Sequence, residues 1–376
     1  MHTDLTAREH STLPAIPRAG SSGRVFRSFV AILMAGVLLM LAACGGSDTS
    51  VAETATPAPA RVNGFGTTAN HPHSMLALPN KVLLLATHYG LFRSEDNGAT
   101  WKVTAGGAGQ LMDGMMTYSL TNNTLNDQHL YVLTQQVAPT LKGTLGLYTS
   151  ADQGRTWKLS NTTAALGNIF MTAGGNDTAD QVYIYLNDLG PLGLKVSMDG
   201  GQHFTDTGKL PFSSFTKLLV VPGAPGHLLV GSSDGLARSS DGGQHWEVIK
   251  NITGAVLSLT TPGPKGAIYA SGDAGIYVSH DGGATFSSVY TKSSLGEIVV
   301  APSQPQVLYA KTGTAIYRSS DGGHTWNTLP RVKGNMYSLA ADPANPEQVY
   351  LSLSYPAEVY RFDQSNQSWT SLTPKP

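Results

Sequence analysis

One pattern recurs along this chain of 376 residues. A short apolar run leads to a serine, and an aspartate, a glycine and a closing aromatic residue follow two, four and seven positions later. Six segments carry the whole pattern: residues 90–101, 146–157, 193–204, 235–246, 275–286 and 315–326. A seventh, residues 358–369, keeps the tyrosine and the closing tryptophan but lacks the serine and the aspartate. All five tryptophans occupy the closing position, so the segments are repeats of one structural unit.

The repeat has a direct structural interpretation. Alternation of apolar and polar residues predicts a strand, and the aspartate and glycine predict a tight turn into the next strand. Two more strand-like runs precede each turn, for example residues 74–78 and 81–87 in the first repeat. Residues 62–376 number 315, which is seven units of 45 residues. Four-stranded antiparallel units at this period predict an all-β, seven-bladed β-propeller.

The repeated segments also resemble a known family. Ser-x-Asp-x-Gly-x-Thr-Trp is similar to the Asp-box, or BNR, repeat of sialidases, sortilin-type receptors and photosystem II assembly factors. The resemblance implies the propeller fold but no particular activity, because the motif is a turn shared by proteins of unrelated function. We therefore interpret its aspartates as structural. They are Asp96, Asp152, Asp199, Asp241, Asp281 and Asp321.

The N-terminus has the features of an export signal. Two arginines precede an apolar run over residues 29–43, which is shorter than the roughly 20 residues that span a bilayer. The run ends in Leu-Ala-Ala-Cys, which resembles the lipobox of bacterial lipoproteins. We expect a signal peptide over residues 1–43, lipidation of Cys44, the only cysteine, and a flexible tether over residues 44–61. The resemblance implies a membrane-anchored protein that faces the extracellular or periplasmic side.

The charge composition limits the partners. Lysine plus arginine number 24 and aspartate plus glutamate number 25, and only 13% of residues are charged. A general nucleic-acid binder is therefore excluded. We expect a monomer that binds a protein or glycan ligand on the face opposite the Asp-box turns, where propellers of this family bind their ligands.

The residues expected on that face can be compared with the catalytic residues of two kinds of enzyme. The family's sialidases hold their substrate with three arginines, but only Arg61 and Arg331 are placed to reach the face. A different glycoside hydrolase would need two carboxylates flanking one bond. Asp234, Asp273 and Asp188 lie in predicted turns on this face, although neighbouring glycines explain them as turn residues. A hydrolase of this kind remains the alternative to a binding module.

A histidine group in the first blade is the other candidate site. His71 and His73 open the first predicted strand and His88 ends the second, so we expect the three to meet near the axis. Asp113 opens the next blade at the same height, beside Met115 and Met116. Imidazoles with a carboxylate suit zinc, and imidazoles with thioether sulfur suit copper. The other interpretation is that these side chains only pack at the mouth of the channel. The sequence thus leaves a metal site open, with copper or zinc as its cofactor.

Overall fold

The computed structural model describes residues 66–67, 69–137, 143–291 and 295–374. Arg61–Pro376 forms a compact unit. The predicted signal peptide, Cys44 and the tether lie outside the described residues. Within those residues, no helix has the length and apolar character needed to cross a membrane.

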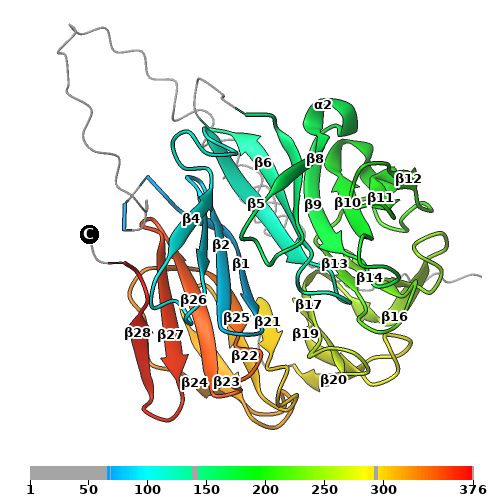
Figure 1. The fold of residues 1–376 in the computed structure, drawn as a ribbon. Helices are drawn as coiled ribbons and strands as arrows, with labels where there is room; N and C mark the ends of the chain where they lie inside the picture. Colours follow the sequence, from blue (N-terminus) through cyan, green and yellow to red (C-terminus); the bar gives the residue numbers. More distant parts are fainter. Residues whose placement is uncertain (1–65, 68, 138–142, 292–294, 375–376) are drawn as a thin grey trace, which may run out of the picture. The chain divides into compact units, whose positions relative to one another are not determined.

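In the described residues, twenty-eight strands form seven four-stranded antiparallel sheets, each built from consecutive strands. The chain is a seven-bladed β-propeller with almost no helix, as predicted (Figure 1). Blade 1 contains β1 (Pro72–Leu78), β2 (Val82–Thr87), β3 (Leu91–Ser94) and β4 (Lys102–Ala105). Blade 2 contains β5 (Met115–Asn122), β6 (Leu130–Gln136), β7 (Gly146–Ser150) and β8 (Lys158–Thr162). Blade 3 contains β9 (Ile169–Gly174), β10 (Val182–Leu186), β11 (Leu194–Ser197) and β12 (Thr205–Asp206).

The remaining four blades repeat the same order. Blade 4 contains β13 (Lys217–Val220), β14 (Leu228–Gly231), β15 (Gly235–Ser239) and β16 (Glu247–Thr253). Blade 5 contains β17 (Val256–Thr260), β18 (Ile268–Gly272), β19 (Gly275–Ser279) and β20 (Ser287–Tyr290). Blade 6 contains β21 (Glu297–Val300), β22 (Leu308–Lys311), β23 (Ile316–Ser319) and β24 (Asn327–Thr328). Blade 7 contains β25 (Asn335–Ala341), β26 (Gln348–Ser354), β27 (Glu358–Asp363) and β28 (Ser368–Ser371).

The core lies between the blades. Every residue of β2 is buried, because this strand packs against a neighbouring blade on both of its faces. Leu84 packs in the cluster between blades 1 and 2, and its neighbours Leu83 and Leu85 pack in the cluster between blades 1 and 7. Alternate side chains of a strand point to opposite faces, so one strand serves two interfaces. The described residues form such a cluster between every pair of adjacent blades.

The ring closes where the first and last blades meet. The innermost strands β1 and β25 are in contact, and Figure 1 shows the blue and red blades side by side. The Trp101 Nε1–H of blade 1 donates to the Leu372 carbonyl at 3.0 Å, just beyond β28. Blade 7 forms its own outer strand, and among the described residues no strand precedes Pro72. We call this junction the closure seam.

The repeated turns share one hydrogen-bond pattern. In the first, the Ser94 hydroxyl donates to Asp96 Oδ1 at 2.7 Å and accepts the Gly98 N–H at 2.8 Å. Asp96 in turn accepts the N–H and the hydroxyl of Thr100 at 2.8 and 2.6 Å. Gly98 has a φ of 84°, a conformation that favours glycine. The five other complete repeats have the same serine–aspartate contact at 2.7–2.8 Å.

Because strands alternate in direction, these turns all lie on one face of the ring. The connections between second and third strands, and those between successive blades, lie on the opposite face, which we call the loop face. Its connections include the short helix α2 (Thr163–Leu166) and the 3-10 segment η1 (Asn187–Leu192).

Candidate functional site

Three histidines come together where β1 and β2 reach the loop face. The His88 N–H donates to the His71 carbonyl at 2.9 Å, which extends the β1–β2 pairing by one step beyond Pro72 and Thr87. His73 lies at a register shift between Pro72 and Ser74. An irregularity of this kind changes the direction of the side chain it carries. The backbone pairing of β1 with β2 and the register shift at His73 thus explain why the three imidazoles lie together at the end of this hairpin.

The three rings are in mutual contact. His71 stacks on His88 with ring centroids 4.7 Å apart, and His73 meets His71 edge-on at 4.6 Å. The centroids of His73 and His88 are 5.9 Å apart. One ring nitrogen from each residue lies within 4.8 Å of the others. The structure therefore brings these three predicted residues together, as a group that is geometrically able to hold a metal ion.

Each ring also has a buried nitrogen without a hydrogen-bond partner among the described residues. These atoms are His71 Nδ1, His73 Nε2 and His88 Nδ1. Burial, with a contribution from His88, lowers the pKa of His71 to about 4. Burial and the two other histidines lower the pKa of His73 to about 3, and burial lowers that of His88. All three imidazoles are neutral at pH 7, so the group presents lone pairs rather than charge.

Groups that the sequence did not single out hold this cluster in place. The buried Asn70 accepts the Tyr89 N–H at 3.0 Å and donates to the Tyr89 carbonyl at 3.3 Å. It thereby ties the residue before His71 to the residue after His88. Asparagine is common in turns, so nothing in the sequence distinguished this one. The only available signal was its position beside His71.

Aromatic rings surround the cluster on the loop face. Tyr89 meets His88 edge-on at 4.7 Å, and Tyr355 of blade 7 stacks on His71 at 4.6 Å. The Tyr337 hydroxyl, also from blade 7, donates to the His73 carbonyl at 3.3 Å. The cluster therefore lies at the closure seam, between groups of the first and last blades.

Asp113 is not part of this group. Its carboxylate accepts the Gly109 N–H at 2.8 Å within the connection from blade 1 to blade 2. Met112 and Met115 are fully buried in the hydrophobic cluster between these blades. The ligand set that the described residues assemble thus contains imidazoles without a carboxylate, since the preceding loop engages Asp113.

The three carboxylates considered for hydrolysis are exposed on the loop face. Asp234 lies between β14 and β15, where its N–H donates to Ser232 Oγ at 2.9 Å. Asp273 occupies the equivalent turn of blade 5, and its N–H donates to the Ala255 carbonyl at 3.1 Å. Asp188 lies in η1. All three residues are exposed and lie in connections between strands of three separate blades.

A partly buried carboxylate near the axis was not singled out by the sequence. Glu297, the first residue of the inner strand β21, has its Oε2 3.5 Å from the Lys311 ammonium nitrogen and accepts the Leu339 N–H at 3.2 Å. Burial raises the pKa of Glu297, while Lys311 and Lys217 oppose that change. Glu297 and Lys311 are paired residues of β21 and β22, whereas Lys217 of blade 4 and Leu339 of blade 7 approach them only in the closed ring. The local sequence therefore contained no signal for the whole group.

The arginines of the third strands serve the blades themselves. The Arg93 Nε–H donates to the Gln153 carbonyl at 2.7 Å, which links blade 1 to the turn of blade 2. Arg238 pairs with Glu247 at 2.7 Å, and Arg318 pairs with Glu347 at 2.8 Å. These guanidinium groups are therefore engaged away from the loop face.

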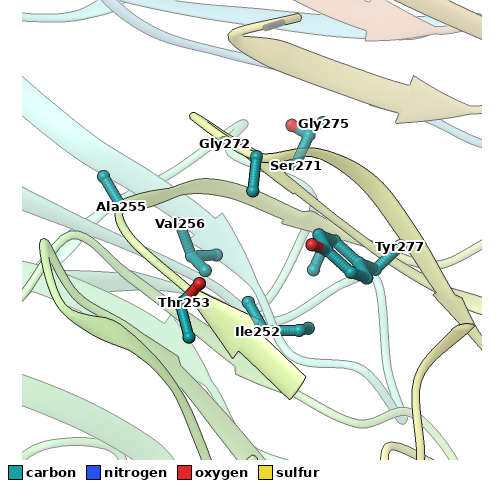
Figure 2. A pocket seen from close by; sticks show the side chains of 10 residues that line it. Ile252, Thr253, Ala255, Val256, Ser271, Gly272, Gly275 and Tyr277 are labelled. Carbon is teal, nitrogen blue, oxygen red and sulfur yellow. The ribbon is translucent and has the colours of Figure 1, made fainter. Parts of the chain in front are cut away.

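Two cavities lie elsewhere on the ring. Figure 2 shows the first, beside Ile252, Val256 and Tyr277; its volume of about 10 Å³ holds no more than a water molecule. The second has a volume of about 270 Å³ and lies at the closure seam on the face opposite the loop face. Its buried Asp342 already accepts the Tyr350 hydroxyl at 2.7 Å.

Comparison with known proteins gives relatives by structure alone. No family model matches the sequence, and no curated protein matches it. The chain is similar in structure to a GH74 enzyme of Niastella koreensis, with a TM-score of 0.60 and 15% identity over 80% of this chain and 53% of the enzyme. It is equally similar to the GH74 xyloglucanase of Xanthomonas campestris, with a TM-score of 0.60 and 17% identity over 83% of this chain and 55% of that enzyme. The chain thus spans about half the length of these enzymes.

A third neighbour has nearly the size of the described ring. YCF48 bound to a D1 peptide has a TM-score of 0.58 and 15% identity, over 80% of this chain and 95% of YCF48. These identities establish a shared β-propeller fold. The fold is shown; the activity is not carried over with it.

Proposed function

We propose that this protein is a lipid-anchored, extracytoplasmic binding or assembly module that takes up a protein partner on its loop face. The observation that carries the proposal is the distribution of exposed apolar side chains. Twelve large hydrophobic residues in the described part are more than a third exposed, and eight of them lie on the loop face or where inner strands open onto it. They are Tyr89, Leu111, Phe170, Leu189, Leu192, Leu257, Tyr337 and Tyr355.

This distribution favours a protein over a glycan. Isolated exposed leucines are common on any surface, but a concentration on one face is typical of a site for a partner. Leu189 and Leu192 in η1 are 48% and 59% exposed, and aliphatic side chains of this kind pack against apolar side chains of a peptide. The likeness to YCF48 bound to a peptide is consistent with this choice.

The test uses the full chain in its own membrane, with a photo-reactive amino acid at Leu192. A matched control carries the same group at Leu125, which is 51% exposed in a turn on the opposite face. We expect a discrete cross-linked protein from position 192 alone, and its loss when Leu189 is also changed to Glu. Cross-linking from both positions, or from neither, would overturn the proposal. Cys44→Ser should release the protein from the membrane fraction.

A glycoside hydrolase is the second candidate, because two structural neighbours are GH74 enzymes. Asp188, Asp234 and Asp273 are exposed on the loop face, where a polysaccharide has access to them. Purified protein would be incubated with xyloglucan and a panel of aryl glycosides. Hydrolysis that is lost in Asp234→Asn or Asp273→Asn would replace the binding module with an enzyme, whereas no hydrolysis by the parent would exclude this candidate for those substrates.

A further inference from the structure

The imidazole cluster at the closure seam has a property that packing alone leaves unexplained. His71, His73 and His88 each keep a nitrogen that is shielded from solvent and has no hydrogen-bond partner among the described residues. A buried polar atom without a partner costs free energy, typically about 1–3 kcal/mol. Three such atoms in one contiguous group indicate that a ligand completes them.

We propose that His71, His73 and His88 form a binding site for one late first-row divalent metal ion, Zn²⁺ or Cu²⁺. The inference goes beyond the proposed function, since partner binding on the loop face does not require a metal.

The geometry fits such an ion. With metal–nitrogen distances of about 2.0–2.1 Å, tetrahedral coordination separates two ligand nitrogens by roughly 3.3–3.5 Å. One nitrogen of each imidazole already lies within 4.8 Å of the other two, so coordination requires the side chains to rotate and bring these nitrogens closer together. His73 and His88 are partly exposed, which gives the ion an entry path from the loop face.

The chemistry of the ligands selects the kind of ion. Neutral imidazole suits zinc and copper, whereas calcium and magnesium require oxygen ligands. Among the described residues no fourth His, Cys, Asp or Glu joins the three histidines, which leaves one position for water or for a group of the partner, as in open zinc sites. The usual order of stability predicts that Cu²⁺ binds more tightly than Zn²⁺.

The surroundings are arranged to hold the ligands. Asn70 fixes the backbones on either side of His71 and His88, Tyr337 bonds the His73 carbonyl, and Tyr355 stacks on His71. Groups of this kind orient ligands in metal sites. Because Tyr337 and Tyr355 belong to blade 7, an ion bound here also stabilises the seam between the first and last blades.

The test uses residues 61–376, a compact unit that contains every hydrophobic cluster of the described residues. After chelator treatment, Zn²⁺ and Cu²⁺ are titrated by calorimetry, and Co²⁺ by its visible d–d absorption. We expect one ion per chain, a higher Tm with Zn²⁺, and the absorption of tetrahedral Co²⁺. His73→Ala and His88→Ala should each weaken binding by more than about 100-fold, the upper end of what outer groups of a metal site contribute.

The control is a His203→Ala/His245→Ala variant, which removes two exposed histidines whose side chains are 88% and 90% exposed on the other face. It should bind as the parent does. Absence of binding by the parent, or equal binding by His73→Ala and the parent, overturns the proposal, as does loss of binding in the control. If a histidine variant unfolds, Cu²⁺ bound to the parent still decides the matter, since its electron paramagnetic resonance must show nitrogen ligands.

Discussion

The indole N–H of Trp101 donates a hydrogen bond to the main-chain carbonyl of Leu372, 271 residues further along the chain. Trp101 is 7% exposed, and its ring packs with Leu83 of blade 1 and with Tyr350 and Leu372 beyond the seam. Within the described residues no strand is exchanged between the first and last blades, so the ring is closed by side-chain packing and by hydrogen bonds such as this one.

Trp101→Ala should therefore destabilise the whole ring. Removing a buried tryptophan typically costs about 3–5 kcal/mol, through lost packing and the cavity that remains. Trp101→Phe keeps much of the packing but removes the hydrogen bond, so we expect a smaller loss of unfolding free energy. The missing hydrogen bond should account for about 1 kcal/mol, in addition to the effect of the smaller ring. Denaturant unfolding of residues 61–376 measures both variants. Equal stability of Trp101→Ala and the parent would show that the seam does not depend on this contact.

The propeller could be predicted from the sequence because the motifs that specify each blade are short and recur along the chain. The closing tryptophans and the Ser-x-Asp-x-Gly turns recur in blade after blade, and strand alternation places each turn on the same face. The predicted runs over residues 74–78 and 81–87 correspond to β1 (Pro72–Leu78) and β2 (Val82–Thr87). Lys81 lies instead in the turn, where its φ of 66° prevents regular strand geometry.

The candidate site was only partly predictable. The meeting of His71 with His88 follows from hairpin pairing, which the sequence indicates. The direction of His73 depends on a register shift between Pro72 and Ser74, and no residue type signals that shift. Tyr355 stacks on His71, and Glu297 accepts the Leu339 N–H, only because other blades of the ring lie beside them, so these contacts depend on long-range geometry. Asp113, expected at the same height as the histidines, is instead engaged by its own loop, through a local contact with the Gly109 N–H.

The turn aspartates predict an acid-dependent stability. Hydrogen bonds from the His245 backbone N–H and ring lower the pKa of Asp241 to about 2. The carboxyl of the unfolded chain has its ordinary pKa near 3.8. The folded state thus binds this proton less readily, and the stabilisation is complete above pH 4 and is lost as pH falls towards 2.

Asp241→Asn should accordingly be less stable than the parent at pH 6, with a difference that narrows between pH 4 and pH 2. Urea unfolding at a series of pH values measures this. His245→Ala keeps the backbone donor, the larger of the two contributions, so it should retain part of the pH dependence. A difference between Asp241→Asn and the parent that is constant with pH would contradict the assigned role.

Asn70 should act as a positioning residue for the histidine cluster. Asn70→Ala leaves the Tyr89 N–H and carbonyl without their side-chain partner, for which we expect a loss of about 1–3 kcal/mol in unfolding free energy. If the metal proposal holds, Zn²⁺ affinity should also fall by about 10–100-fold. Asn70→Asp keeps an acceptor for the Tyr89 N–H. Its stability and its Zn²⁺ affinity should therefore lie between those of Asn70→Ala and those of the parent. A variant that loses stability but binds Zn²⁺ as the parent does would limit Asn70 to a structural role.

The Glu297–Lys311 pair near the axis provides the last prediction. Removing one member of a buried ion pair leaves an uncompensated charge, typically at about 3–5 kcal/mol when both are fully buried. The side chains of Glu297 and Lys311 are 31% and 15% exposed, so we expect a smaller loss for Lys311→Met, of about 1–3 kcal/mol. Glu297→Gln combined with Lys311→Met removes both charges and should recover part of that loss.

The pH dependence of the parent's stability distinguishes the effect of burying Glu297 from the effect of its pairing with Lys311. Burial raises the pKa of Glu297, so above pH 4.5 the unfolded chain releases this proton more readily than the folded ring does. Its contribution to stability therefore decreases as pH rises from 4.5 through the raised pKa, and Glu297→Gln should remove that decrease. Unfolding of the parent, the two single variants and the double variant at pH 4.5 and pH 8 measures both effects. If Lys311→Met is as stable as the parent at pH 8, where Glu297 is most ionised, the pair does not stabilise the ring.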